Sequence, residues 1–188
     1  MSVQIARRHF NTAEYYRMAA AGVLSENDRV ELIEGEIVEM NPIGSRHAAC
    51  VGRLTKLLER LAGDYAIVWV QNPVQVNDYS EPLPDVALLK PRDDFYAQAN
   101  PQPADVLLII EVADSSVEYD REIKMPLYAQ SGIPEVWLIN LPQDTLEIYT
   151  QPLGEAYRQI RLVKRGESLT AQTISSLALT IKADSILG

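Results

Sequence analysis

The chain has 188 residues, of which 47% are hydrophobic and 23% are charged, as in a globular protein with a substantial core. Its formal net charge of −9 excludes a generally basic nucleic-acid-binding surface, but not a local basic patch. No apolar run is long enough to span a bilayer, and the first ten residues lack the apolar core of a secretory signal. The single cysteine, Cys50, fits a reducing compartment. We therefore expect one cytoplasmic domain over residues 1–188.

The N-terminal part predicts a helix, a hairpin and a second, longer helix. Thr12 can cap a first helix that runs to about Ala21, and residues 29–40 are typical of a hairpin with its turn at Glu34-Gly35. Leucines and a valine at helical spacing predict a helix over residues 45–61. Its basic side chains fall largely off this apolar stripe, and they include Arg46, Arg53 and Lys56.

The remainder of the chain predicts strands with one helix among them. The expected strands are residues 67–76, 86–89, 106–112 and 135–140, with a loop over 91–103 and a helix over about 121–130. Residues 146–149 and 157–163 predict a further hairpin, and the tail from Ser175 fits either a strand or a small helix. This order of elements indicates an α/β fold with a mixed sheet.

Two carboxylates stand at the ends of apolar strands. Asp85 follows Pro84 and opens the run over residues 86–89, whereas Glu111 closes the run over residues 106–110. If these strands pair antiparallel, the two carboxylates converge at one end of the pair. Burying both is costly unless a cation or protons neutralise them. A divalent metal meets that demand, although Asp85 alone is typical of a loop residue and Glu111 could instead have a structural partner such as Arg121.

The motifs carrying these residues resemble the PD-(D/E)XK nuclease superfamily over roughly residues 10–165. They are Pro84-Asp85, the segment 111–116, the segment 119–124, Tyr128, and Gly132 to Trp137, with Glu31 to Glu36 and His47 further upstream. Within the superfamily, the chain is similar to the Uma-two branch of restriction-type endonucleases. The resemblance implies a restriction-endonuclease-like mixed β-sheet flanked by helices, with added N-terminal and C-terminal β-hairpins.

The resemblance also implies roles for individual residues. Asp85, Glu111 and the carbonyl of Val112 would bind Mg²⁺, for which Mn²⁺ could substitute. The usual lysine position, two residues after the glutamate, is Ala113 here, so the catalytic lysine would be Lys124 on the next helix. We expect replacement of Lys124 to leave folding nearly intact, and the alternative is an ordinary lysine that pairs with Asp120 at i, i+4.

Three further residues are accessory candidates. His47 fits the family pattern and could contact phosphate or a second metal, although a lone histidine is usually a packing residue. Glu31 alternates with apolar neighbours, so a solvent-facing hairpin position is nearly as good an interpretation as a site role. Asp120 is better suited to positioning Lys124 or capping the helix than to binding metal. Tyr128 and Trp137 are more typical of a core.

The function expected from these residues is magnesium-dependent hydrolysis of DNA phosphodiester bonds. Arg46, Arg53 and Lys56 would track phosphates, although such residues often form only the solvated face of a helix. Restriction-type enzymes often cut two strands as pairs, so a homodimer is expected. The alternatives are a nucleic-acid-binding or regulatory protein without turnover and a phosphohydrolase that acts on small nucleotides.

Overall fold

The central feature of the fold is a six-stranded mixed sheet in the order β3-β4-β5-β6-β7-β8. The computed structural model describes residues 7–25, 27–172 and 180–188. The strands are β3 (Ile67–Val70), β4 (Val86–Leu89), β5 (Val106–Ala113), β6 (Glu135–Asn140), β7 (Thr145–Leu153) and β8 (Ala156–Lys164). Only the β5–β6 pair is parallel within this sheet. The predicted α/β fold with a mixed sheet is confirmed.

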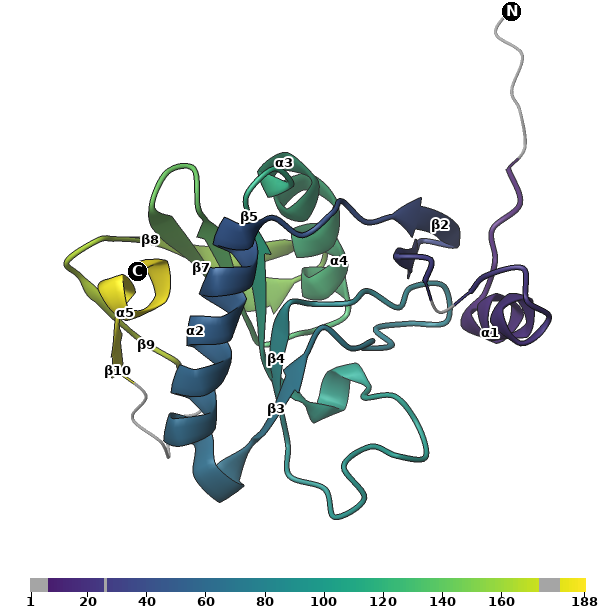
Figure 1. The fold of residues 1–188 in the computed structure, drawn as a ribbon, viewed down its shortest axis with the longest axis horizontal. Helices are drawn as coiled ribbons and strands as arrows, with labels where there is room; N and C mark the ends of the chain where they lie inside the picture. The colour runs from purple at the N-terminus through teal and green to yellow at the C-terminus, as the bar shows by residue number, and fades with distance from the viewer. Residues whose placement is uncertain (1–6, 26, 173–179) are drawn as a thin grey trace, which may run out of the picture.

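Each face of the sheet carries its own hydrophobic core. The helix α2 (Ser45–Ala62) crosses one face and buries Cys50, Leu54 and Leu58 against β4 and β5, while α5 (Ala183–Leu187) lies beside it (Figure 1). The helix α4 (Met125–Gln130) covers the opposite face, where Leu127 and Tyr128 are buried. The sheet is thus enclosed between two layers. Among the described residues, no helix is long and apolar enough to cross a bilayer.

Outside the main sheet lies an N-terminal unit. It consists of α1 (Thr12–Ala20) and the hairpin of β1 (Val30–Ile33) with β2 (Glu36–Glu39), and it stands to one side of the sheet in Figure 1. A β-bridge between Leu32 and Glu81 joins the hairpin to the segment that leads into β4, and Gly35 N–H donates to the carbonyl of Tyr79 on the same segment. The hairpin is therefore attached near the N-terminal end of β4. At the other side, β9 (Ser168–Thr170) pairs with β10 (Thr180–Lys182).

The segment between β5 and β6 is not one regular helix. It runs as α3 (Val117–Tyr119), a π-helical turn (Asp120–Lys124) and α4. The N–H of Met125 donates to the carbonyl of Asp120, five residues earlier. In a continuous α-helix the ring of Pro126 would clash with the carbonyl four residues before it, and the wider turn lies directly ahead of this proline.

Most of the predicted elements are present, with four differences. Asn11, not Thr12, caps the first helix, because its side chain accepts from Glu14 N–H in a capping box. The strand predicted over residues 67–76 ends at Val70, and the segment before β4 is irregular. The helix predicted from residue 121 begins earlier, at Val117, and the C-terminal hairpin extends further at both ends. The tail contains both a strand and a helix, whereas residues 173–179 lie outside the described residues.

Gly35 generates a testable prediction about the hairpin. Its φ is +81°, and a Cβ there would lie 2.5 Å from His9 Cβ and 3.0 Å from His9 Cα. Gly22 has a similar φ of +73° with nothing within 4 Å, so Gly22→Ala is a matched control. We expect Gly22→Ala to lower the free energy of unfolding by ~1–2 kcal/mol through backbone strain. Gly35→Ala should cost ~1–3 kcal/mol more through the clash. Urea unfolding measures both values, and equal losses would contradict this account of the turn.

Candidate active site

A cleft of about 490 Å³ opens between the hairpin, the start of α2 and the α3–α4 segment. It is lined by all of the residues predicted to take part in catalysis or metal binding. These are Asp85, Glu111, Val112 and Lys124, together with the accessory candidates Glu31, His47 and Asp120. Residues separated by almost a hundred positions in the sequence are therefore brought to one place.

The register of β4 and β5 juxtaposes the two carboxylates. Val86 pairs antiparallel with Ile110, so Asp85 and Glu111 occupy the next positions along the two strands. The N–H of Val112 donates to Asp85 Oδ2 at 2.9 Å, and Asp85 N lies 3.4 Å from Glu111 Oε2. Each carboxylate thus contacts a backbone N–H at the end of the neighbouring strand. This is the arrangement that the positions of the two carboxylates in the sequence predicted.

Lys124 is buried between two carboxylates from different parts of the chain. Its side chain is 5% exposed, and Nζ lies 3.1 Å from Glu31 Oε2 and 3.3 Å from Glu111 Oε1. The alternative ion pair with Asp120 is not formed, because the π turn changes the i, i+4 geometry and Asp120 accepts from Ser116 Oγ instead. The solvent-facing interpretation of Glu31 is also wrong, since its side chain is 3% exposed.

Burial and mutual charge shift the pKa values of this cluster. Burial raises the pKa of Glu111 to about 8, with Lys124 opposing the shift and the carboxylates of Asp120 and Asp85 adding to it. Burial also raises the pKa of Asp120. For Lys124, burial would lower the pKa, but the charges of Glu111 and Glu31 outweigh it and raise that pKa. Glu111 and Asp120 therefore bind a proton more readily than free carboxyl groups, as expected where several carboxyl groups are buried around one ammonium.

His47 contacts the first carboxylate from the N-terminal turn of α2. Its Nε2 lies 3.0 Å from Asp85 Oδ2, and this hydrogen bond raises the pKa of His47 against the opposing effect of burial. The Nδ1 atom is buried and has no hydrogen-bond partner among the described residues. Gln71 donates to the other oxygen, Asp85 Oδ1, at 3.2 Å. Both oxygens of Asp85 are thus held in place before any ligand binds.

Two tyrosines also belong to the site, although the sequence did not identify either of them as a site residue. Tyr128 is fully buried, as expected for a core residue, but its hydroxyl donates to Glu111 Oε1 at 2.6 Å. The hydroxyl of Tyr119 donates to Glu31 Oε1 at 3.1 Å. Both tyrosines flank Lys124 on the same segment, and this closeness in the sequence could have identified them as site residues. Arg121, the alternative partner for Glu111, pairs with Glu147.

The donor atoms suit a hard divalent cation. Within residues 7–25, 27–172 and 180–188, no three His, Cys, Asp or Glu side chains are grouped as a metal site. The predicted ligands are instead two carboxylates, those of Asp85 and Glu111, with the carbonyl of Val112 as a third oxygen. Magnesium binds through one or two carboxylates and keeps several waters, so this set fits it better than a cage of side chains would. The number of carboxylates in the cluster also favours binding of a cation.

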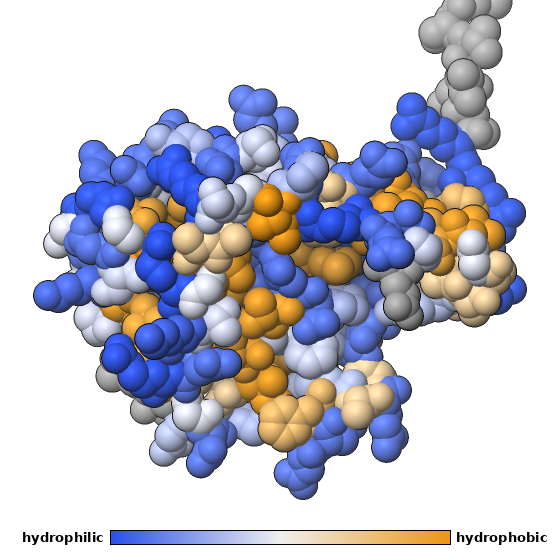
Figure 2. Space-filling model, in the orientation of Figure 1, coloured by the Kyte–Doolittle hydropathy of each residue, from blue (hydrophilic) through white to orange (hydrophobic). Residues whose placement is uncertain are grey.

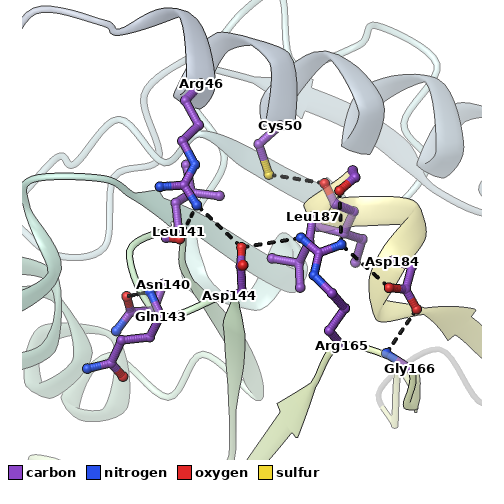
Figure 3. Close-up of polar contacts among 12 residues, drawn as sticks. Arg46, Cys50, Asn140, Leu141, Gln143, Asp144, Arg165, Gly166, Asp184 and Leu187 are labelled. Carbon is purple, nitrogen blue, oxygen red and sulfur yellow. Dashed lines mark hydrogen bonds and ion pairs between the residues drawn. The ribbon is translucent and has the colours of Figure 1, made fainter.

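The basic residues of α2 are largely engaged within the protein. Arg46 donates to the carbonyl of Leu141 and lies 3.3 Å from Asp144, on which Arg165 also converges (Figure 3). Arg53 donates to the carbonyls of Ile186 and Leu187 at 2.9 and 2.8 Å. Lys56 is exposed. Arg53 is therefore half-buried against α5, whereas the side chain of Arg46 is still 51% exposed beside the β6–β7 turn. Phosphate binding by this face stays a prediction.

The burial of Lys124 changes the expected effect of its removal on stability. Lys124→Ala would leave Glu31 and Glu111 buried without their cation, so we expect a loss of ~3–5 kcal/mol in the free energy of unfolding. Lys90→Ala, which removes an exposed lysine, should change it by less than ~0.5 kcal/mol. Urea unfolding at pH 7 provides the comparison. Similar values for both variants would show that Lys124 is dispensable for folding, as the sequence alone predicts.

Comparison with known proteins places the chain in a family. Residues 12–182 match the Uma2 family, described as "putative restriction endonuclease". A crystal structure from Anabaena variabilis ATCC 29413, described as a "putative nuclease belonging to DUF820", superposes with a TM-score of 0.69. The sequences are 17% identical, and the match covers 89% of this chain and 94% of that one, so it shows a shared fold. No curated protein matches the chain. The family match spans most of the sequence, and the chain therefore belongs to the Uma2 family.

Proposed function

We propose that the protein is a magnesium-dependent endonuclease that hydrolyses DNA phosphodiester bonds. The observation that carries the proposal is the convergence of Asp85, Glu111 and Lys124 on one cleft at the end of the β4–β5 pair. Two carboxylates for a cation beside a buried ammonium are suited to a reaction in which negative charge develops on a phosphoryl group. The family assignment supports the same reaction class.

The residues of the site divide the chemistry between them. Asp85 and Glu111 would hold the metal, which when bound lowers the pKa of a coordinated water and neutralises charge on the phosphate. Val112 N–H and His47 fix the orientation of Asp85 Oδ2, while Tyr128 fixes Glu111 Oε1. Lys124 would hold the attacking water or stabilise charge on the phosphoryl oxygens. The hydrogen bonds to both carboxylates reduce the reorganisation needed when substrate binds.

The proposal extends to the setting of the reaction. Because Cys50 is buried and unpaired, the protein fits a reducing compartment such as the cytoplasm. Restriction-type enzymes often act in pairs on the two strands of a duplex, so the active form would be a homodimer. Light scattering at several protein concentrations tests this point, and a monomer at all of them would contradict it.

A cleavage assay tests the central proposal. Purified protein would be incubated with supercoiled plasmid, single-stranded DNA and RNA in magnesium or manganese, with EDTA as the control. We expect nicked and linear plasmid only when the metal is present. Metal binding without cleavage of any substrate would favour the alternative of a non-catalytic binding protein. Hydrolysis of free nucleotides but not of plasmid would favour a small-nucleotide phosphohydrolase.

The metal ligands make a separate prediction. Asp85→Asn and Glu111→Gln should each weaken manganese binding measured by calorimetry and lower plasmid cleavage at least about 100-fold. Glu81→Gln is the matched control, because Glu81 is also 2% exposed but its carboxylate contacts Tyr16 and Asn100 outside the cleft. It should bind metal and cleave like the wild type. Unchanged manganese affinity in Glu111→Gln would remove Glu111 from the metal site.

The exposed lysine of α2 makes a prediction about DNA. Lys56→Ala should lower DNA affinity and reduce the slope of log K against log salt by about 0.9 for each phosphate that the variant no longer neutralises. Arg53→Ala should instead lower stability, because its side chain holds the carbonyls of Ile186 and Leu187. Binding across a salt series, with unfolding measured in parallel, separates the two effects. Equal slopes for Lys56→Ala and the wild type would show that DNA does not contact this part of α2.

A further inference from the structure

Glu31 is the member of the cluster that comes from outside the main sheet. It lies on β1, where the polar neighbours of apolar residues normally face solvent, yet its side chain is 3% exposed. Each of its two oxygens is used. Oε1 accepts from Tyr119 OH at 3.1 Å, and Oε2 accepts from Leu83 N–H at 3.2 Å and lies 3.1 Å from Lys124 Nζ. A carboxylate so fully engaged has a fixed position.

The contacts of Glu31 reach both sides of the proposed reaction centre. On one side is Lys124, whose ammonium contacts both Glu31 and Glu111. On the other is Leu83, two residues before Asp85, so the same carboxylate holds the loop that delivers Asp85 to the cleft. Tyr119 lies on α3, immediately before the π turn that carries Lys124. The side chain thus joins the hairpin, the loop before β4 and the lysine-bearing segment.

The position of the Lys124 ammonium depends on Glu31. Without Glu31, the direct contact of the ammonium at 3.3 Å would be with Glu111, and the charge of Asp120 would also attract it. With Glu31 at 3.1 Å, Nζ is held between two carboxylates while Lys124 lines the cleft. Glu111 then keeps an oxygen, Oε2, that faces Asp85 and not the lysine.

We infer that Glu31 is a positioning residue, which holds Lys124 at the reaction centre, between its own carboxylate and that of Glu111. The inference rests on the proposed nuclease function, which it deepens by assigning the hairpin a part in catalysis. Glu31 does not bind the metal in this scheme. Its removal should therefore impair turnover while leaving metal affinity unchanged.

The experiment compares plasmid cleavage and manganese binding in the full-length protein. Glu31→Gln keeps the shape and one acceptor oxygen but removes the charge, and it should lower kcat about 10- to 100-fold with little change in KM. Glu81→Gln, the other buried glutamate bonded to this hairpin through its backbone, should cleave like the wild type. Tyr119→Phe removes only one hydrogen bond to Glu31 and should cause a smaller loss, so it serves if Glu31→Gln folds poorly.

A double-mutant cycle separates positioning from other roles. In a Lys124→Met background, Glu31→Gln should cause no further loss of activity, because there is no ammonium left to position. Losses that multiply, or a fall in manganese affinity in Glu31→Gln, would overturn the inference by making Glu31 an independent group or a ligand. A wild type that cleaves while Glu31→Gln and Tyr119→Phe cleave equally well overturns this inference alone. A wild type that cleaves no substrate overturns the proposed function and this inference with it.

Discussion

The structure depends on one electrostatic constraint, which is a buried ammonium surrounded by more carboxylates than it can neutralise. Glu31, Glu111 and Asp120 are all buried near Lys124. An isolated charge in such surroundings would cost several kcal/mol, so each carboxylate needs a partner. Hydrogen bonds from Tyr119, Tyr128 and Ser116 supply part of this compensation. The remaining negative charge is what a cation in the cleft would offset.

A different feature of the fold positions each member of this cluster. Antiparallel register sets Asp85 beside Glu111, and a slip of one strand by one residue would send one of the two side chains to the opposite face. The π turn before Pro126 places Asp120 and Lys124 inward together, although neither pairs with the other. The bridge between Leu32 and Glu81 fixes the hairpin so that Glu31 faces the sheet. No single element could assemble the site alone.

The sequence predicted the parts of this arrangement that depend on local periodicity and strand ends. The hairpin turn at Glu34-Gly35, the apolar stripe of α2 and the convergence of Asp85 with Glu111 all follow from spacing. The burial of Glu31 does not, because alternation along β1 cannot show that another element covers its outer face. For the same reason the partners of Arg53 were not predictable, since they are carbonyls of α5, more than a hundred residues away. Long-range packing decides such cases.

The charge of the cleft explains why a metal would matter for the approach of a phosphate as well as for the reaction. Six carboxylates line it, against Arg29, Lys124 and His47. Figure 2 shows apolar side chains between α2 and the neighbouring strands within a largely hydrophilic face. Arg46 and Arg53 of α2 both donate to carbonyl groups of the protein itself. Two like charges 4 Å apart repel by roughly 4 kcal/mol at an effective dielectric constant of 20. A phosphate entering this cleft without a cation would be repelled by these carboxylates. On the proposed function, a divalent cation must therefore bind before or with the substrate, and attraction from the protein itself must come from exposed cations outside the cleft, such as Lys56.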